Sequence, residues 1–204
     1  MNKINTIVFD LGGVLIDWNP KYLYRKVFDT ETRIDWFLNN ICTSEWNVQQ
    51  DAGRSFSEAT QLLVNQYPEY EKEIRFFYDR WTEMLGGAIQ DTVSLLHRLK
   101  AANSHALYAL TNWSDEAFPV ARERFDFLQL FEGIVVSGEE KTRKPFRDIY
   151  EILIERYGLT PQKSVFIDDN LENVLGAIAV GMQGIHFKNS RQLINELNHL
   201  GVRI

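Results

Sequence analysis

Four groups of polar residues stand where apolar stretches of the sequence end, and each group carries a reactive or phosphate-compatible side chain. The groups are Asp10 with Gly12 and Gly13, Thr111 with Asn112, Lys144 before Pro145, and Asp168 with Asp169. In an open parallel sheet, ligands bind beyond the carboxyl ends of the strands. If the apolar stretches are strands of one such sheet, the four groups converge on a single site.

Taken singly, three of the groups have a simpler explanation. An aspartate at a strand end is often a turn or helix-capping residue, and the pair Thr111–Asn112 fits the N-cap of a helix that begins near Ser114. Lys144 lies in the charged stretch KTRKPFR, which is typical of a solvated face. The pair Asp168–Asp169 differs, because adjacent like charges after the apolar VFI cost free energy unless a cation or a hydrogen-bond donor offsets them.

Five short segments rich in β-branched and aromatic residues are predicted strands. They cover residues 6–11, 105–112, 133–139, 164–170 and 184–187. Between the later segments, apolar residues recur at helical spacing: Val93, Leu95, Leu96 and Leu99, then Ile149, Ile152 and Leu153, then Val174, Leu175 and Ile178. Strands that alternate with helices predict a doubly wound α/β fold, in which helices cover both faces of a mostly parallel sheet through right-handed crossovers.

Residues 17–86 interrupt this alternation with a helix-like stretch that is rich in aromatic residues and has no convincing strand. We therefore expect an all-helical insertion after the first strand. The predicted domains are an α/β core at residues 1–16 and 87–204 and a helical cap at residues 17–86. Gly86 and Gly87 fit a hinge where the chain returns to the core, or a simple helix end.

The composition limits the environment and the partners. A chain of 204 residues, 45% hydrophobic and 25% charged, is typical of a globular protein with one domain and a modest insertion. Its net charge of −6 disfavours nucleic acid as a partner. No apolar run approaches the ~20 residues of a membrane-spanning helix, and Asp10 interrupts the only stretch that resembles a signal peptide. Because Cys42 is the single cysteine, no internal disulfide can form and we expect a cytoplasmic protein. We also expect a monomer or homodimer without membrane contacts.

In this order, the four groups resemble the motifs of the haloacid dehalogenase (HAD) superfamily. Those motifs are a strand ending in a nucleophilic aspartate, a strand ending in Ser or Thr, a lysine before the next helix, and a strand ending in an acidic pair. The corresponding stretches here are IVFDLGGVL, ALTN, the lysine of RKP, and VFIDDN. The resemblance extends from residue 4 to about residue 187, and the insertion falls where the superfamily places its commonest cap. The DLG of the first motif is similar to that of bacterial sugar-phosphate phosphatases of the glucose-1-phosphate type.

The resemblance implies a magnesium-dependent phosphatase that acts on a small phosphorylated metabolite. Asp10 would attack the phosphorus, and water would then hydrolyse the aspartyl phosphate. A carboxylate that attacks a phosphate ester approaches a group of its own charge sign, so a divalent cation between them is close to obligatory. Mg²⁺ would be held by Asp10, the backbone carbonyl of Gly12 and Asp169. Asp168 would hold metal-bound waters or pair with Lys144.

The same resemblance assigns the phosphoryl group to donors from the first three motifs. Lys144 would neutralise both Asp10 and the phosphoryl group. The Thr111 hydroxyl and the backbone amides of Leu11 and Asn112 would donate hydrogen bonds to the phosphoryl oxygens, over which charge spreads in the transition state.

Gly12 departs from the superfamily pattern, because most of its phosphatases have an aspartate here that protonates the leaving group and then activates water. General acid or base catalysis is typically worth about 10²–10⁴ in rate. We therefore hypothesise a substrate with an acidic leaving group, such as a sugar 1-phosphate or an acyl phosphate. Asp17 is a candidate substitute acid, although its position before Pro20 also fits the start of a helix.

The cap is expected to exclude water and to contact the rest of the substrate. Trp18, Trp46 and Trp113 are candidates for lining that space, with a buried-core role as the alternative for each. The four histidines show no metal-ligand spacing and receive no role.

Other functions compete with this interpretation. Haloacid dehalogenases proper use the same aspartate to attack carbon and also lack the second aspartate, but they need no metal and usually lack the acidic pair. A weakly active relative that binds a phosphorylated metabolite also fits Gly12. Receiver domains combine similar residues, but in another order and without a large insertion.

Overall fold

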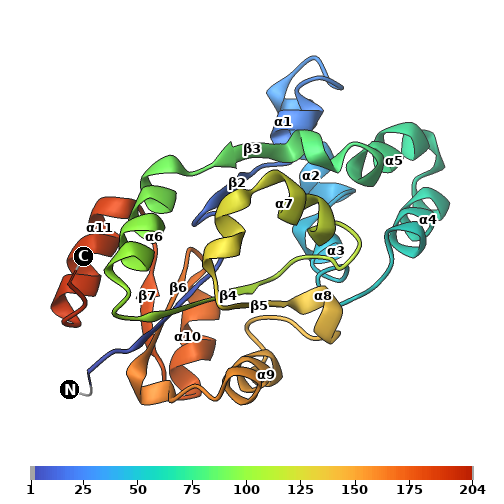
Figure 1. Cartoon of the computed structure of the whole chain (residues 1–204). Helices are drawn as coiled ribbons and strands as arrows, with labels where there is room; N and C mark the ends of the chain where they lie inside the picture. The colour runs from blue at the N-terminus through green and yellow to red at the C-terminus, as the bar shows by residue number, and fades with distance from the viewer. Residues whose placement is uncertain (1–2, 204) are drawn as a thin grey trace.

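The computed structural model describes residues 3–203 and is built around a five-stranded parallel sheet (Figure 1). The strand order is β5-β4-β1-β6-β7. The strands are β1 (Thr6–Phe9), β4 (Ala106–Thr111), β5 (Gly133–Val136), β6 (Ser164–Asp168) and β7 (Gln183–His186). Each lies within a predicted strand or one residue from it, so the α/β fold with a parallel sheet is confirmed.

Helices cover both faces of the sheet, and side chains of the central strand alternate between them. The helices of the first face are α6 (Gln90–Ala102), α7 (Phe118–Arg124) and α11 (Ser190–His199), and those of the second are α9 (Arg147–Tyr157) and α10 (Leu171–Ala179). Ile7 and Phe9 of β1 pack with the first group, whereas Val8 packs with the second. The predicted crossover helices correspond to α6, α9 and α10. No helix in residues 3–203 has both the length and the apolar character needed to cross a membrane.

Residues 19–84, called the helical segment below, contain helices but no strand. The helices are α1 (Lys21–Tyr24), α2 (Glu31–Asn40), α3 (Ser44–Asn47), α4 (Phe56–Gln66), α5 (Glu71–Asp79), and the short 3₁₀ helices η1 (Pro68–Tyr70) and η2 (Trp81–Met84). Thr30, Thr43 and Ser55 begin three of them by accepting a hydrogen bond from a backbone N–H of the first turn. The segment has its own aromatic core, in which the ring of Tyr24 lies 4.9 Å from that of Phe37. The expected helical insertion is therefore present, as several short helices.

A two-stranded antiparallel ribbon joins the helical segment to the sheet domain, where we expected no strand. It pairs β2 (Ile16–Trp18) with β3 (Leu85–Ala88). Strand propensity does not predict β3, because its sequence LGGA contains two glycines and glycine weakens strands in general. Here Gly86 permits a close approach, since a Cβ at that position would overlap the carboxylate of Asp17. Asp17 accepts a hydrogen bond of 2.7 Å from the hydroxyl of Tyr22 and lies in the ribbon rather than at a helix start.

Three further details differ from the expectations. Residues 137–139, predicted as strand, lie in the short helix α8 (Ser137–Glu140). The helix after β4 begins at Phe118, so Thr111–Asn112 does not cap it. Leu175 and Ile178 are exposed on α10 although their spacing is helical. The remaining short helices are η3 (Asp126–Leu130) and η4 (Pro161–Lys163).

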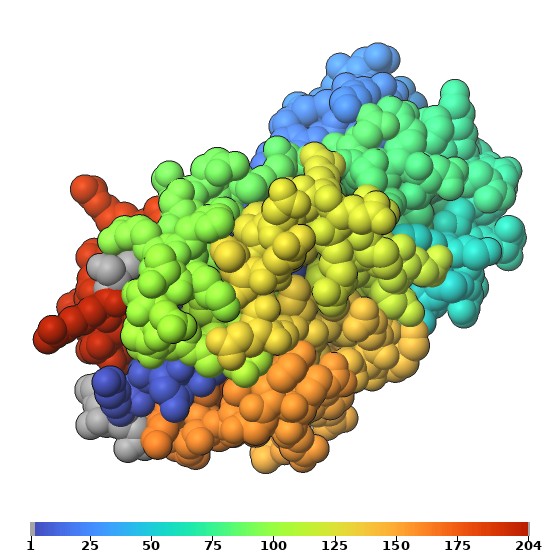
Figure 2. Space-filling model, in the orientation of Figure 1, coloured from blue at the N-terminus to red at the C-terminus, as the bar shows by residue number. Residues whose placement is uncertain are grey.

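The helical segment forms one end of the molecule (Figure 2). Hydrogen bonds near α7 tie it to the sheet domain. The backbone N–H of Phe56 donates to the Glu116 carboxylate at 2.7 Å. The Arg124 guanidinium donates to the backbone carbonyl of Thr82 in the helical segment and to that of Leu85 in the ribbon, each at 3.2 Å. These ties hold the helical segment over the carboxyl ends of the strands.

Candidate active site

The sheet brings three of the four sequence groups to one edge. Asp10 directly follows β1, while Thr111 and Asp168 are the last residues of β4 and β6. Both of those strands pair with β1 in parallel, so their carboxyl ends lie next to each other. The convergence expected from a parallel sheet is therefore present.

Lys144 is buried at the centre of this site and is not part of a solvated face. Its side-chain ammonium Nζ lies 2.8 Å from Asp10 Oδ1 and 2.7 Å from Asp168 Oδ2, and it donates to the carbonyl of Leu110 at 2.9 Å. Burial alone would lower the pKa of Lys144, but the adjacent carboxylates raise it above its ordinary value. The ammonium therefore stays charged between two acidic groups.

The side chain of Asn112 positions Lys144 through its backbone. Asn112 Oδ1 accepts from the Lys144 N–H at 2.9 Å, and Asn112 Nδ2 donates to the Lys144 carbonyl at 3.1 Å. Both polar ends of the amide are thus occupied. The sequence assigned the backbone amide of Asn112 to the phosphoryl group, and the structure adds a positioning role for its side chain.

Asp168 is fully buried, and three protein donors saturate its carboxylate with four hydrogen bonds. Lys144 bonds Oδ2, the backbone N–H of Asn170 bonds Oδ1 at 2.8 Å, and the Asn173 amide bonds both oxygens at 3.1 Å. Such a carboxylate is a better support for its neighbours than a direct metal ligand. Asp169, by contrast, is exposed to the pocket, and His186 contacts its backbone carbonyl at 2.9 Å.

The three carboxylates form the one acidic group in residues 3–203 with the spacing of a metal site. Oxygens of Asp10, Asp168 and Asp169 lie within 4.8 Å of one another. Burial, followed by the charge of Asp168, raises the pKa of Asp10 well above its ordinary value, and the same two causes raise the pKa of Asp169. Among residues 3–203, the ammonium of Lys144 is the one cation that opposes these negative charges at contact distance. An oxygen-rich site with excess negative charge suits a hard divalent cation such as Mg²⁺.

The nucleophile candidate has one oxygen engaged and one without a protein donor. Asp10 Oδ1 accepts from Lys144 and, at 2.7 Å, from the backbone N–H of Leu11. The Leu11 amide, which the sequence assigned to the phosphoryl group, is therefore directed at Asp10. No hydrogen bond from the described residues reaches Asp10 Oδ2, which is the arrangement that an attacking oxygen needs.

Thr111 has a buried hydroxyl without a hydrogen-bond partner in the described chain. An unpaired buried hydroxyl costs free energy, so it needs an explanation. A phosphoryl oxygen bound beside Asp10 would supply the missing partner, in agreement with the role that the sequence motif assigned to Thr111.

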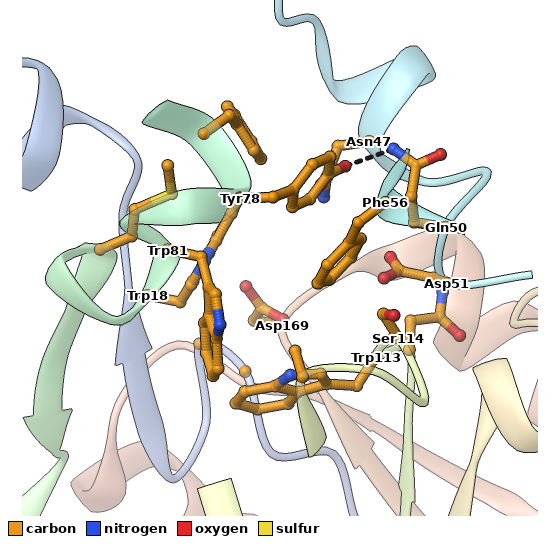
Figure 3. Close-up of a pocket in the computed structure, with 16 residues that line it drawn as sticks. Trp18, Asn47, Gln50, Asp51, Phe56, Tyr78, Trp81, Trp113, Ser114 and Asp169 are labelled. Atoms are coloured by element: carbon orange, nitrogen blue, oxygen red, sulfur yellow. Dashed lines mark hydrogen bonds between the residues drawn. The ribbon is translucent and has the colours of Figure 1, made fainter. Parts of the chain in front are cut away.

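A pocket of about 290 Å³ opens above the acidic group, and half of its lining residues belong to the helical segment (Figure 3). Its lining includes Gly12, Gly13, Asn112, Ser114 and Asp169 from the sheet domain. Aromatic residues form much of the remaining wall, namely Trp18, Phe56, Phe77, Tyr78, Trp81 and Trp113. Trp18 and Trp113 thus lie where the sequence analysis placed them. Trp46 instead packs in the core of the helical segment, where its indole N–H donates to the carbonyl of Ala59.

Several site residues carried no sequence signal. Asn173 and His186 reach the acidic pair from α10 and β7, and neither belongs to a recognisable motif. Gln50 and Asp51 enter the pocket from the connection between α3 and α4. A polar residue in a short connection resembles any other loop residue until the fold places it against the site.

Comparisons with known proteins agree with this geometry. Residues 4–181 match the haloacid dehalogenase-like hydrolase family. A sesquiterpene phosphatase of Aspergillus oryzae is 34% identical over 194 residues, which cover 95% of this chain and 94% of that protein. A HAD-like family hydrolase from Porphyromonas gingivalis superimposes with a TM-score of 0.75 at 21% identity, covering 98% of this chain and 99% of that one.

A further solved structure is a HAD family enzyme from Bacteroides thetaiotaomicron in complex with magnesium and inorganic phosphate. It superimposes with a TM-score of 0.68 at 23% identity, covering 91% of this chain and 95% of that one. The family match covers most of the chain, and the Aspergillus phosphatase is similar along nearly all of it. On this evidence, the protein belongs to the haloacid dehalogenase-like hydrolases.

Proposed function

We propose that the protein is a magnesium-dependent phosphatase that hydrolyses a small phosphorylated metabolite through an aspartyl phosphate on Asp10. The observation that carries this proposal is the contact of Asp10 with the buried Lys144 beside two further carboxylates. A carboxylate nucleophile and an adjacent ammonium suit attack on an anionic phosphorus centre.

Asp10, Lys144 and Thr111 would have different roles in the reaction. Asp10 Oδ2 would attack the phosphorus, while Lys144, 2.8 Å from Asp10 Oδ1, would offset the charge of Asp10 and of the phosphoryl oxygens. The Thr111 hydroxyl, which has no partner in the described chain, would donate to a phosphoryl oxygen. Mg²⁺ would be held by Asp10, Asp169 and the carbonyl of Gly12, and it would neutralise charge on the phosphoryl group.

We further propose that residues 17–86 act as a cap and that residues 1–16 and 87–204 form the catalytic core. The pocket lies between the two, so a substrate bound there is enclosed by aromatic side chains of the helical segment. Enclosure excludes bulk water and strengthens the electrostatic interactions of the site.

The composition of the pocket wall favours a substrate whose leaving group carries no charge. No lysine or arginine side chain lines it within the described chain, so a second phosphate or a carboxylate would find no cation there. Trp18, Trp81 and Trp113 offer flat apolar surfaces instead. A sugar 1-phosphate fits these surfaces and the acidic leaving group hypothesised from Gly12.

An isoprenoid phosphate is a second candidate, and two observations favour it. The wall is rich in aromatic residues, and the Aspergillus relative is named as a sesquiterpene phosphatase. Both candidates keep the same reaction at Asp10 and differ only in the leaving group.

The decisive experiment measures inorganic phosphate released from a panel of sugar 1-phosphates, sugar 6-phosphates, isoprenoid phosphates and phosphoglycolate. Each is assayed with Mg²⁺ and with a chelator, for the parent and for Asp10→Asn. We expect release by the parent only, and only with the metal. Glu45→Gln, which changes an exposed residue of α3, is the matched control and should match the parent.

The same assays test the competing functions. Halide release from 2-haloacids in the presence of a chelator would identify a dehalogenase instead. Thermal stabilisation by a sugar phosphate without phosphate release would identify a binding protein. Activity retained by Asp10→Asn would refute the covalent mechanism.

A further inference from the structure

Asp51 is an acidic residue that the helical segment contributes to the active-site pocket. It lies in the connection between α3 and α4, and its carboxylate faces the same cavity as Asp169 and Ser114 (Figure 3). Its carboxylate makes no hydrogen bond or ion pair with any other residue of the part that the structure describes. A half-buried acid without a protein partner is free to interact with a ligand.

The connection that carries Asp51 is held against the sheet domain at two points. Gly53, with φ of +90°, packs so closely on Lys141 that a Cβ there would overlap the lysine side chain. Lys141 in turn forms a 3.0 Å ion pair with Asp115. Further along the chain, the N–H of Phe56 donates to the Glu116 carboxylate. Asp51 is thereby fixed over the pocket.

Burial brings the protonation equilibrium of Asp51 close to neutral pH. Burial raises the pKa of the Asp51 carboxyl to about 7, against the opposing charges of Arg143 and Lys144. The Tyr78 hydroxyl also lies within electrostatic reach, and burial, together with the charge of Asp51, keeps the pKa of that phenol above its ordinary value. Tyr78 therefore stays neutral, and Asp51 is the group here that exchanges a proton near pH 7.

Gly12, which stands where most phosphatases of the superfamily have an acid, faces the same pocket as Asp51. Gly12 lines the cavity, and no heavy atom would lie within 4 Å of a Cβ placed there. Asp17, the substitute acid considered from the sequence, does not line the cavity, and its carboxylate accepts from Tyr22 in the ribbon. Asp51 is the remaining acid of the lining apart from Asp169.

We propose that Asp51 is the general acid and base of the reaction, supplied from the helical segment in place of the residue missing at Gly12. This inference rests on the proposed function. As Asp10 bonds to phosphorus and the ester P–O bond breaks, Asp51 gives its proton to the leaving oxygen, which departs as the alcohol. Asp51 then takes a proton from water as the water oxygen bonds to phosphorus and the P–O bond to Asp10 breaks. Inorganic phosphate forms, and Asp51 is again protonated.

The test compares two leaving groups in Asp51→Asn, with Glu45→Gln as the matched control. For a simple alkyl phosphate, whose leaving group needs a proton, we expect kcat/KM to fall by about 10²–10⁴. For p-nitrophenyl phosphate, whose leaving group departs as the anion, kcat/KM should change far less. A rapid burst of p-nitrophenol and an accumulating aspartyl phosphate should appear, because the second step loses its base.

The outcomes separate this inference from the proposed function. An equal fall in kcat/KM for both esters, or parent-like kcat/KM for both, would overturn the role of Asp51. Retained p-nitrophenyl phosphate activity shows that the variant is folded, so a selective loss reports chemistry. If Asp10→Asn kept its activity, the proposed function would fail whatever Asp51 does.

Discussion

Asn112 holds the backbone of Lys144 at both its N–H and its carbonyl, which sets the ammonium between two carboxylates. The residues are 32 positions apart in the chain, so the contact exists only in the folded protein. It links the end of β4 to the loop before α9, and it supports the charge that faces Asp10. The contacts that position Lys144 in the active site therefore also join two parts of the folded core.

Removing the ammonium should destabilise the fold as well as abolish activity. Lys144→Met leaves Asp10 and Asp168 as buried acids without their cation, and loss of one partner of a buried ion pair typically costs about 3–5 kcal/mol. Urea denaturation would measure this loss. Lys163→Met, which changes an exposed lysine, should stay within about 0.5 kcal/mol of the parent. Equal stability of the two variants would refute the structural role of Lys144.

Two adjacent glycines should differ in their effect on magnesium binding. Gly13 has φ of +69°, and a Cβ there would overlap the Asp169 carboxylate, so Gly13→Ala should displace that ligand. Gly12→Ala keeps the backbone carbonyl and has open space. We expect Mg²⁺ to raise the Tm of Gly12→Ala as in the parent, but to have little effect on Gly13→Ala. A normal response of Gly13→Ala would argue against Asp169 as a ligand.

The pH dependence of the reaction should report Asp51. Because burial raises the pKa of Asp51 to about 7, the carboxyl is protonated below that pH and ionised above it. An acid must be protonated to donate, so kcat/KM for an alkyl phosphate should fall as the pH rises through about 7. The alkaline limb should be absent in Asp51→Asn. A parent profile identical to that of the variant would contradict the assignment.

An acid restored at Gly12 should relieve the need for Asp51. The open space beside Gly12 accommodates a longer side chain facing the pocket. In Asp51→Asn, the additional change Gly12→Asp should therefore recover a large part of kcat/KM for alkyl phosphates. Gly12→Asn in the same background fills similar space without an exchangeable acid proton and should recover none. Equal effects of the two changes would show that shape rather than proton transfer was restored.

The aromatic wall should control affinity for the leaving group. Trp18 is 40% exposed and lines the pocket, whereas Trp36 is 46% exposed and does not line it. Trp18→Ala should raise KM for isoprenoid or sugar phosphates about two- to tenfold, since an aromatic contact contributes about 0.5–1.5 kcal/mol. Trp36→Ala should leave KM unchanged. The substrate class whose KM rises more in Trp18→Ala is the class that stacks on the indole.

If Asp51 protonates the leaving group, the substrate no longer needs a leaving group that is acidic by itself. The sequence argument for a sugar 1-phosphate assumed that no acid replaces the one missing at Gly12. An acid supplied by the helical segment removes that requirement and admits primary alcohols, including the isoprenoid class. The substrate panel therefore tests chemistry and pocket shape together.

The amino-acid sequence alone determined the central sheet and the convergence of its reactive residues. Apolar strand segments ending in Asp10, Thr111 and Asp168 are local signals, and parallel pairing must bring their carboxyl ends together. The order of those residues also indicated the family. By contrast, Lys144 reads locally as part of a charged surface, because burial depends on partners 24 or more residues distant.

Only the tertiary structure decided which residues support and complete the site. Asn112, Asn173 and His186 act through hydrogen bonds to distant residues, which leave no periodic pattern in the chain. The β2–β3 ribbon was hidden by glycines that are needed for close packing against Asp17. Asp51 sits between short helices whose placement depends on contacts with Lys141 and Glu116. Long-range packing, rather than local propensity, brings it to the pocket.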